Sequence, residues 1–289
     1  MTRNTILLLL FVIGLLAFKS DKPAYLLLNK KGKTVKFKKM VDAAANADVV
    51  FFGELHNNPI SHWLQYELTN ELLKRKGQKL VLGAEMFEAD NQISLSQYLA
   101  GEIEKDQFKK DVRLWPNYKT DIEPLVELAK ENKLRFIATN IPRRYASMVF
   151  RHGIESLDTL PGEVKAWIAP LPMDYDPELP GYKSMLTMMG DMQNHASEDF
   201  PKAQAIKDAT MAWFIHMNLK DGESFIHYNG TYHSDHFEGI IWYLKRLRPT
   251  IKILTIASIE TDPLNKLPED KVNVADFIVS VPPTMTKTH

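Results

Sequence analysis

Apolar, strand-like runs alternate with segments of helical periodicity along most of this chain. Six runs are expected as strands, at residues 49–53, 80–85, 134–139, 224–228, 251–256 and 275–280, with a short hairpin before them near residues 25–37. The segments between the strands repeat apolar residues at helical spacing, and the first of them stops at Gly77, a residue typical of helix ends. Strands and helices that alternate in this way form a parallel sheet with right-handed crossovers. The sequence therefore predicts an α/β fold with a mostly parallel central sheet flanked by helices.

Two of these expected strands are followed by the same Gly-x-x-His turn. The first copy is residues 53–56 (Gly-Glu-Leu-His) and the second is residues 230–233 (Gly-Thr-Tyr-His). Glycine allows the backbone to turn sharply at a strand exit, so a histidine three positions later can point back over the strand ends. Because ligands of open parallel sheets bind at the carboxyl ends of the strands, the repeated turn predicts one polar site assembled there.

Other polar side chains follow the remaining strands at the same edge. Glu85 ends a run of buried type, so its carboxylate needs a partner such as a cation, a histidine or a metal ion. Asn140 and Arg143 follow the third strand, and Asp208, on an expected helix, could reach the same edge. His62 lies six residues after His56, which is not a one-face helical spacing, so contact between them requires a helix that starts between them.

Composition excludes several classes of function. Lysine plus arginine total 36 and aspartate plus glutamate total 36, so the chain lacks the clustered basic excess of a nucleic-acid-binding protein. There is no cysteine, which excludes disulfides, thiolate metal ligands, cysteine nucleophiles and an amino-terminal lipid-modified cysteine. Any metal ion would be bound by His, Asp, Glu or Tyr side chains.

The amino-terminal residues resemble an export signal. Residues 6–18 form an unbroken apolar run of 13 residues preceded by Arg3, shorter than the roughly 20 needed to span a bilayer. We expect residues 1–20 to be a signal peptide or an uncleaved signal anchor. The rest, residues 21–289, is expected to be one α/β domain, exported to the periplasm or membrane-anchored facing it.

A proline-rich stretch at residues 160–201 reads as an insertion with a short central helix. Met185, Met188, Met189 and Met192 share one face of that helix. One interpretation is that this methionine face packs on the sheet domain. The other is a lid whose adaptable face covers a large apolar ligand, with His195 just beyond it.

Several ordered segments resemble the ChaN family of haem-binding iron-uptake proteins. The similar segments are residues 53–59 with His62, residues 84–88 with Gln92, and residues 115–118, 138–143, 207–212 and 229–233. The resemblance covers most of the chain after about Asp48. It implies an α/β fold, export, and haem binding in iron acquisition, in at least one member as stacked haems between two subunits with tyrosine as the iron ligand. A haem-dependent homodimer and an outer-membrane haem receptor are expectations of the same kind.

Haem needs an axial ligand, usually His, Met, Cys or Tyr, and flat apolar walls. The candidates lie in the insertion, and they are Tyr175, Tyr182, Met188, Met189, Met192 and His195.

The wider superfamily, which contains the TIKI metalloproteases and the erythromycin esterases, suggests an alternative function. On that interpretation the chain is a metal-dependent hydrolase, a peptidase or an esterase. His56, Glu85 and His233 would hold a divalent metal ion or orient a water molecule. Glu54 would act as general base and Arg143 would stabilise the developing oxyanion, with Glu85 as a further catalytic carboxylate.

Overall fold

A single seven-stranded sheet organises the chain in the computed structural model, which describes residues 22–188 and 199–289. The strands lie in the order β1-β7-β6-β2-β5-β3-β4, and all neighbours are parallel except β1 and β7. Their bounds are Leu26–Asn29 (β1), Val49–Glu54 (β2), Leu80–Glu88 (β3), Arg135–Asn140 (β4), Ser224–Gly230 (β5), Ile253–Glu260 (β6) and Phe277–Val281 (β7). The predicted α/β fold with a mostly parallel sheet is confirmed.

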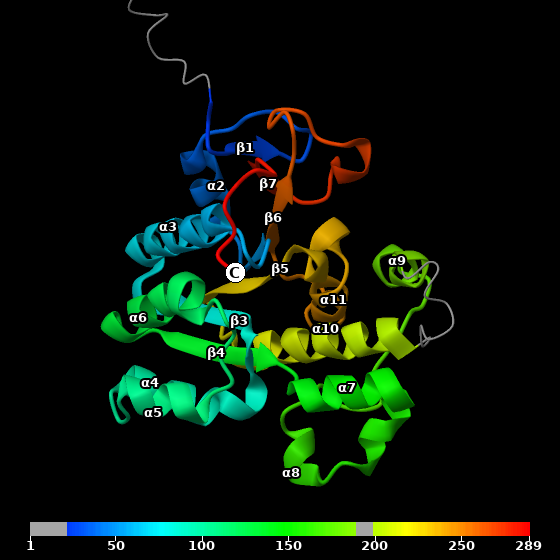
Figure 1. Cartoon of the computed structure of the whole chain (residues 1–289). Coiled ribbons are helices and arrows are strands. Elements are labelled where there is room, and N and C mark those ends of the chain that lie inside the picture. Colours follow the sequence, from blue (N-terminus) through cyan, green and yellow to red (C-terminus); the bar gives the residue numbers. More distant parts are fainter. Residues whose placement is uncertain (1–21, 189–198) are drawn as a thin grey trace, which may run out of the picture.

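Helices cover both faces of this sheet (Figure 1). One face packs against α2 (Phe37–Ala44), α3 (Pro59–Lys76), α4 (Gln92–Ala100), α5 (Lys105–Asp111) and α6 (Glu123–Glu131). The other face packs against α7 (Arg143–His152), α10 (Asp199–Asn218) and α11 (Ile240–Leu247). Two further helices, α8 (Gly162–Lys165) and α9 (Pro180–Met188), lie between α7 and α10 in the chain.

The central strands are buried along their whole length, as expected for parallel strands covered on both faces. The alternation of side chains along β2 sends Val50 and Phe52 into one core, and Val49 and Phe51 into the other. Both cores therefore depend on the same short apolar run.

The start of α3 follows directly from its sequence. Asn58 caps the helix, because its side-chain oxygen accepts hydrogen bonds from the backbone N–H groups of Ile60 and Ser61. Pro59 occupies the first helical position, where a missing N–H costs nothing. The helix thus begins between His56 and His62, the condition required for these two residues to meet.

The expected hairpin near residues 25–37 forms as a short turn with antiparallel pairing. Leu28 bridges Thr34, the Val35 N–H donates to the Leu27 carbonyl oxygen, and the Asn29 N–H donates to the Lys33 carbonyl oxygen. The longer ladder of β1, antiparallel to β7, was not predicted. The six predicted strands are confirmed with shifts of a few residues at their ends. Helices α4, α5 and α8 were not predicted. Within the described ranges, no helix is long and apolar enough to cross a membrane.

Parts of two predictions lie outside the described residues. These are the leader at residues 1–20 and, within the insertion, Met189, Met192 and His195. The rest of the methionine face is partly described, and Met185 is buried against Ala205 of α10 and Tyr182. Met185 thus packs α9 against α10. A lid formed by the insertion remains a prediction.

Candidate functional site

The carboxyl ends of three neighbouring strands bring the two Gly-x-x-His turns together. Strand β5 lies between β2 and β3, and Glu54 is in register with Gly230. The Gly230 N–H donates a 2.8 Å hydrogen bond to Oε2 of Glu85, which follows the last residue of β3 that pairs with β5. The predicted meeting of Glu54, Glu85 and the two turns at one edge of the sheet is therefore observed. We call these residues, with His56 and His233, the strand-end cluster.

The two turns pack directly against each other at their glycines. A side-chain carbon at Gly53 would lie 2.9 Å from the Thr231 Cα atom of the other turn, so it would have to move the backbone of that turn. A side-chain carbon at Gly230 would lie 2.7 Å from His56 Nε2, so it would have to move the His56 ring. Each glycine thus makes room for the other copy of the motif.

The second turn holds a buried histidine between two carboxylates. His233 Nε2 lies 3.2 Å from Glu85 Oε1, and His233 Nδ1 lies 2.5 Å from Asp208 Oδ1. Tyr182 of α9 donates a 2.8 Å hydrogen bond to the other oxygen of Asp208. Asp208 is 1% exposed, so the strand-end cluster continues into the helical layer through α10.

Electrostatics favour an imidazolium at this position. Burial lowers the pKa of His233, but the adjacent carboxylates of Glu85 and Asp208 outweigh burial and raise it to about 10. Burial raises the pKa of Glu85, yet His233, His56 and the Gly230 N–H together hold it well below its usual range. For Asp208 burial prevails, and its pKa is raised despite the bonds from His233 and Tyr182.

The first turn presents its histidine to solvent. His56 Nδ1 lies 2.9 Å from Glu54 Oε1, and its side chain is 40% exposed while that of Glu54 is 1% exposed. Gln65 of α3 donates a 2.6 Å hydrogen bond to Glu54 Oε2, and His62 Nδ1 lies 3.5 Å from the same oxygen. Burial lowers the pKa of His56, but the hydrogen bond that His56 donates to Glu54 and the charges of Glu85 and Glu54 raise it overall. His56 is thus the accessible member of the strand-end cluster.

The predicted hydrolase residues are brought together only in part. Both nitrogens of His233 face carboxylates, which leaves this ring no lone pair for a metal ion. In the residues that the structure describes, no group of three or more His, Asp or Glu side chains is arranged to hold a metal ion, so the predicted divalent-metal site is not supported. Arg143 is exposed and forms no ion pair with a described residue, whereas the neighbouring Arg144 pairs with Asp90 at 2.7 Å.

The predicted haem residues of the insertion have different surroundings. Tyr182 is 3% exposed, with its hydroxyl committed to Asp208. Tyr175 is half-buried against the Tyr182 ring, at 5.9 Å between ring centroids. Met188 is the last residue of α9.

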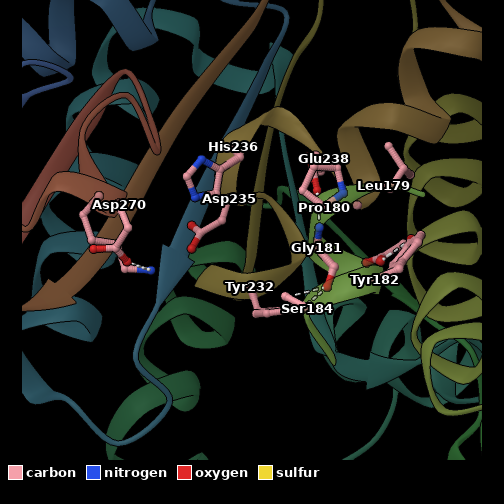
Figure 2. A pocket seen from close by; sticks show the side chains of 13 residues that line it. Leu179, Pro180, Gly181, Tyr182, Ser184, Tyr232, Asp235, His236, Glu238 and Asp270 are labelled. Atoms are coloured by element: carbon pink, nitrogen blue, oxygen red, sulfur yellow. Dashed lines mark hydrogen bonds and ion pairs between the residues drawn. The ribbon is translucent and has the colours of Figure 1, made fainter. Parts of the chain in front are cut away.

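A pocket of about 530 Å³ lies between α9 and the segment that follows the second turn (Figure 2). Its lining includes Leu179, Pro180, Tyr232, Asp235, His236 and Lys271. Figure 2 shows Tyr232 between Asp235 and His236 on one side and Gly181 and Tyr182 on the other. The pocket borders the strand-end cluster, because Asp208 and Tyr182 line it as well. Its volume is in the range of roughly 300–1,000 Å³ typical of ligand and cofactor sites.

Three residues at these sites were not predicted from the sequence. Gln65 and Asp121 support the first turn, and Tyr232 faces the pocket. Tyr232 could have been found, because it lies inside the repeated turn itself. Asp208, which was predicted to reach the site, carried a different signal: an acidic residue within a helix segment that is otherwise mostly apolar or small.

The fold and the strand-end cluster define an α/β protein whose polar site lies at the carboxyl edge of a parallel sheet. A family model described as haem-binding uptake, Tiki superfamily, ChaN matches residues 40–244. The chain therefore belongs to the ChaN family of the Tiki superfamily, as the resemblance of its motifs predicted. No curated protein matches the chain.

Solved structures show the same fold at low sequence identity. A structure of ChaN of Campylobacter jejuni with cofacially bound haem has a TM-score of 0.67 and 15% identity, covering 88% of this chain and 96% of that chain. A protein from Bacillus cereus has a TM-score of 0.51 and 10% identity, covering 90% of this chain and 95% of that chain. An erythromycin esterase variant in its open conformation has a TM-score of 0.47 and 11% identity, covering 90% of this chain and 83% of that chain.

Proposed function

We propose that this protein binds haem in the pocket between α9 and the second Gly-x-x-His turn, with Tyr232 as the axial ligand of the iron. Membership of a haem-binding family supports the class of ligand. The position is supported by one observation, a half-exposed phenol facing a pocket of about 530 Å³ with apolar residues on its wall. Haem supplies a redox-active iron that requires an axial ligand of this kind.

Tyr232 is better placed for this role than the tyrosines of the insertion. Tyr232 is 38% exposed, whereas Tyr182 is buried and bonded to Asp208. The Tyr232 hydroxyl contacts Ser184 Oγ at 3.0 Å and also bonds the Gly181 carbonyl oxygen, so these are contacts that the iron would replace.

The charges around Tyr232 suit a cationic metal centre. Burial raises the pKa of Tyr232, and the carboxylates of Asp208, Glu238 and Asp235 raise it further, so the phenol keeps its proton in the absence of a cation. A bound cation reverses this effect because it stabilises the phenolate. The phenol therefore donates a proton to solvent when it becomes a ligand.

The wall next to Tyr232 offers further polar groups to a haem. His236 is exposed and holds a left-handed backbone conformation (φ 55°). It is the second candidate for the axial position. Lys271 can pair with a propionate carboxylate. Asp235 Oδ1 is buried without a hydrogen-bond partner in the described structure, and burial raises the pKa of this carboxyl to about 7.

Titration of the purified chain with hemin, followed through the Soret band, tests the proposal. We expect saturation at a whole-number stoichiometry with a band shape typical of tyrosinate ligation. Tyr232→Phe should weaken binding and change the band, whereas Tyr66→Phe, a half-buried tyrosine of α3, should not. His236→Asn, which keeps a residue tolerant of the left-handed conformation, distinguishes the two candidate ligands. A response that does not saturate would refute haem binding.

Export and iron acquisition are further parts of this proposal. The apolar run at residues 6–18 supports a signal peptide or a signal anchor, and the lack of cysteine supports a form without a lipid anchor. The cofacial haem of ChaN from Campylobacter jejuni supports a homodimer formed on haem binding, with an outer-membrane receptor as a candidate partner. Cell fractionation would test the location, and light scattering with and without hemin would test the dimer.

A hydrolase using the strand-end cluster remains the alternative function. It predicts an activity that Glu54→Gln or Glu85→Gln abolishes and that hemin does not affect. Under the haem proposal, the Soret spectrum survives both substitutions because neither carboxylate faces the pocket.

A further inference from the structure

The carboxyl-terminal segment, residues 282–289, returns across the edge of the sheet after β7 and ends beside the first Gly-x-x-His turn (Figure 1). The Thr288 N–H donates a 3.0 Å hydrogen bond to the carbonyl oxygen of Asn57, the residue after His56. The Thr288 hydroxyl donates a 2.7 Å hydrogen bond to Asp121 Oδ2. Lys287 forms an ion pair with Glu260 at the end of β6. The segment is thus held by Thr288 beside the first turn and by Lys287 at β6.

Asp121 links this segment to His56 through two further side chains. Its carboxylate is 4% exposed, and the same Oδ2 atom lies 2.8 Å from Asn117 Nδ2 and 3.3 Å from His62 Nε2. Asn117 Nδ2 also donates a 2.8 Å hydrogen bond to the His56 carbonyl oxygen, and His62 Nε2 lies 3.1 Å from that oxygen. Two side chains therefore join Asp121 to the backbone of His56.

The other contacts of His56 depend on the same loop. The Trp115 ring packs edge-on against the His56 ring, with 4.9 Å between their centroids, and Trp115 lies two residues before Asn117. On the opposite side, His62 also lies 3.5 Å from Glu54, the carboxylate that pairs with His56. Displacement of Asp121 would thus disturb the ring and the backbone of His56 together.

We propose that the carboxyl-terminal segment is a structural part of the strand-end cluster, in which Thr288 is a positioning residue that holds His56 in place through Asp121. The segment also forms one wall of a second pocket, of about 330 Å³, whose lining includes His62, Trp63, Asp121 and Thr288. Loss of the segment would open His62 and Asp121 to solvent. This inference is independent of haem binding, since Tyr232 lies on the other turn.

The test compares Thr288→Val with Thr286→Val in the full chain. Thr286 is exposed and its side chain has no hydrogen bond in the described structure, so it is a matched control. Loss of one ordinary hydrogen bond increases local opening about fivefold. We expect amide hydrogen exchange in residues 55–62 to be about fivefold faster in Thr288→Val, with exchange in β5 unchanged.

A second measurement separates positioning of His56 from simple packing. The Glu54 contact contributes to the raised pKa of His56, so Thr288→Val should move the imidazole NMR titration of His56 toward that of an ordinary histidine. A chain that stops after Thr286 should show both changes. Equal exchange and equal titration in the Thr288 and Thr286 variants would overturn the proposal, and so would faster exchange throughout the sheet, which would indicate general destabilisation.

Discussion

We predict that the folded protein loses stability as the pH rises from about 6.5 toward about 10, because of the buried His233. Its pKa is raised from 6.5 to about 10 in the folded chain by Glu85 and Asp208, against the effect of burial. Between these two values the folded state holds a proton that the unfolded state has released. The free energy of unfolding therefore decreases with pH across this window, and the stabilisation from His233 is fully present only below it.

The magnitude follows from the width of the window. One proton contributes about 1.4 kcal/mol per pH unit, so the whole window corresponds to an upper limit of about 5 kcal/mol. Urea unfolding at pH 7, 8 and 9, followed by far-UV circular dichroism, should show a loss of roughly 1 to 3 kcal/mol across these two units.

Two controls identify His233 as the source. His152→Gln removes an exposed histidine at the end of α7 and should leave the slope unchanged. His233→Gln should remove most of the slope and leave the part contributed by His56, whose pKa is also raised. This variant leaves two buried carboxylates facing an uncharged side chain and is expected to be much less stable. NMR titration of the wild-type imidazole provides a direct measurement that does not depend on that variant folding. Stability that is constant or rises from pH 7 to 9, or a His233 resonance that titrates near pH 6.5, would refute the reasoning.

Three other predictions concern single contacts. Gly239→Ala places a carbon against the His233 carbonyl oxygen at φ 56°, so it should cost about 2–4 kcal/mol in urea unfolding, against about 1 kcal/mol for Gly101→Ala at φ 75° in open space. Equal losses would contradict this. Glu54→Gln should lower the pKa of His56 measured by NMR, because it replaces the charged partner of the imidazole, and an unchanged titration would count against the contact. Hemin affinity should rise up to about tenfold per pH unit in the neutral range, since Tyr232 must lose its proton, and a pH-independent affinity would exclude it as the ligand.

The fold was predictable because its signal is local and repeated. Each central strand is a short apolar run, and each crossover helix is an amphipathic or apolar segment between two such runs. The partner of β1 was not predictable in this way, because Leu26 to Asn29 pair with residues some 250 positions later in β7. Helix α5 was missed for another reason: its sequence is mostly charged, and Phe108 is its one buried residue.

The strand-end cluster was predictable to the extent that it follows strand ends. Glu54, Glu85 and the two histidines meet because β2, β5 and β3 are neighbours. Asp121 could not be found by this rule, because it comes from an irregular helical turn at residues 118–122 and reaches His62 only through the tertiary fold. Arg143 satisfies the rule and follows β4, yet it is exposed, because a position after a strand does not determine the direction of a side chain on the next helix.

The two turns share a sequence pattern but have different electrostatic roles. His233 is 5% exposed and held at both nitrogens by carboxylates, whereas His56 is 40% exposed and held at one. Both ring nitrogens of His233 are held by carboxylates, and the residue immediately before His233 is Tyr232, the phenol that faces the larger pocket. A ligand side chain presented by a rigid turn needs little reorganisation to bind a metal centre. The second turn is therefore suited to hold a ligand, while the first provides an imidazole that exchanges protons with solvent and depends on α3 and residues 117–121 for its position.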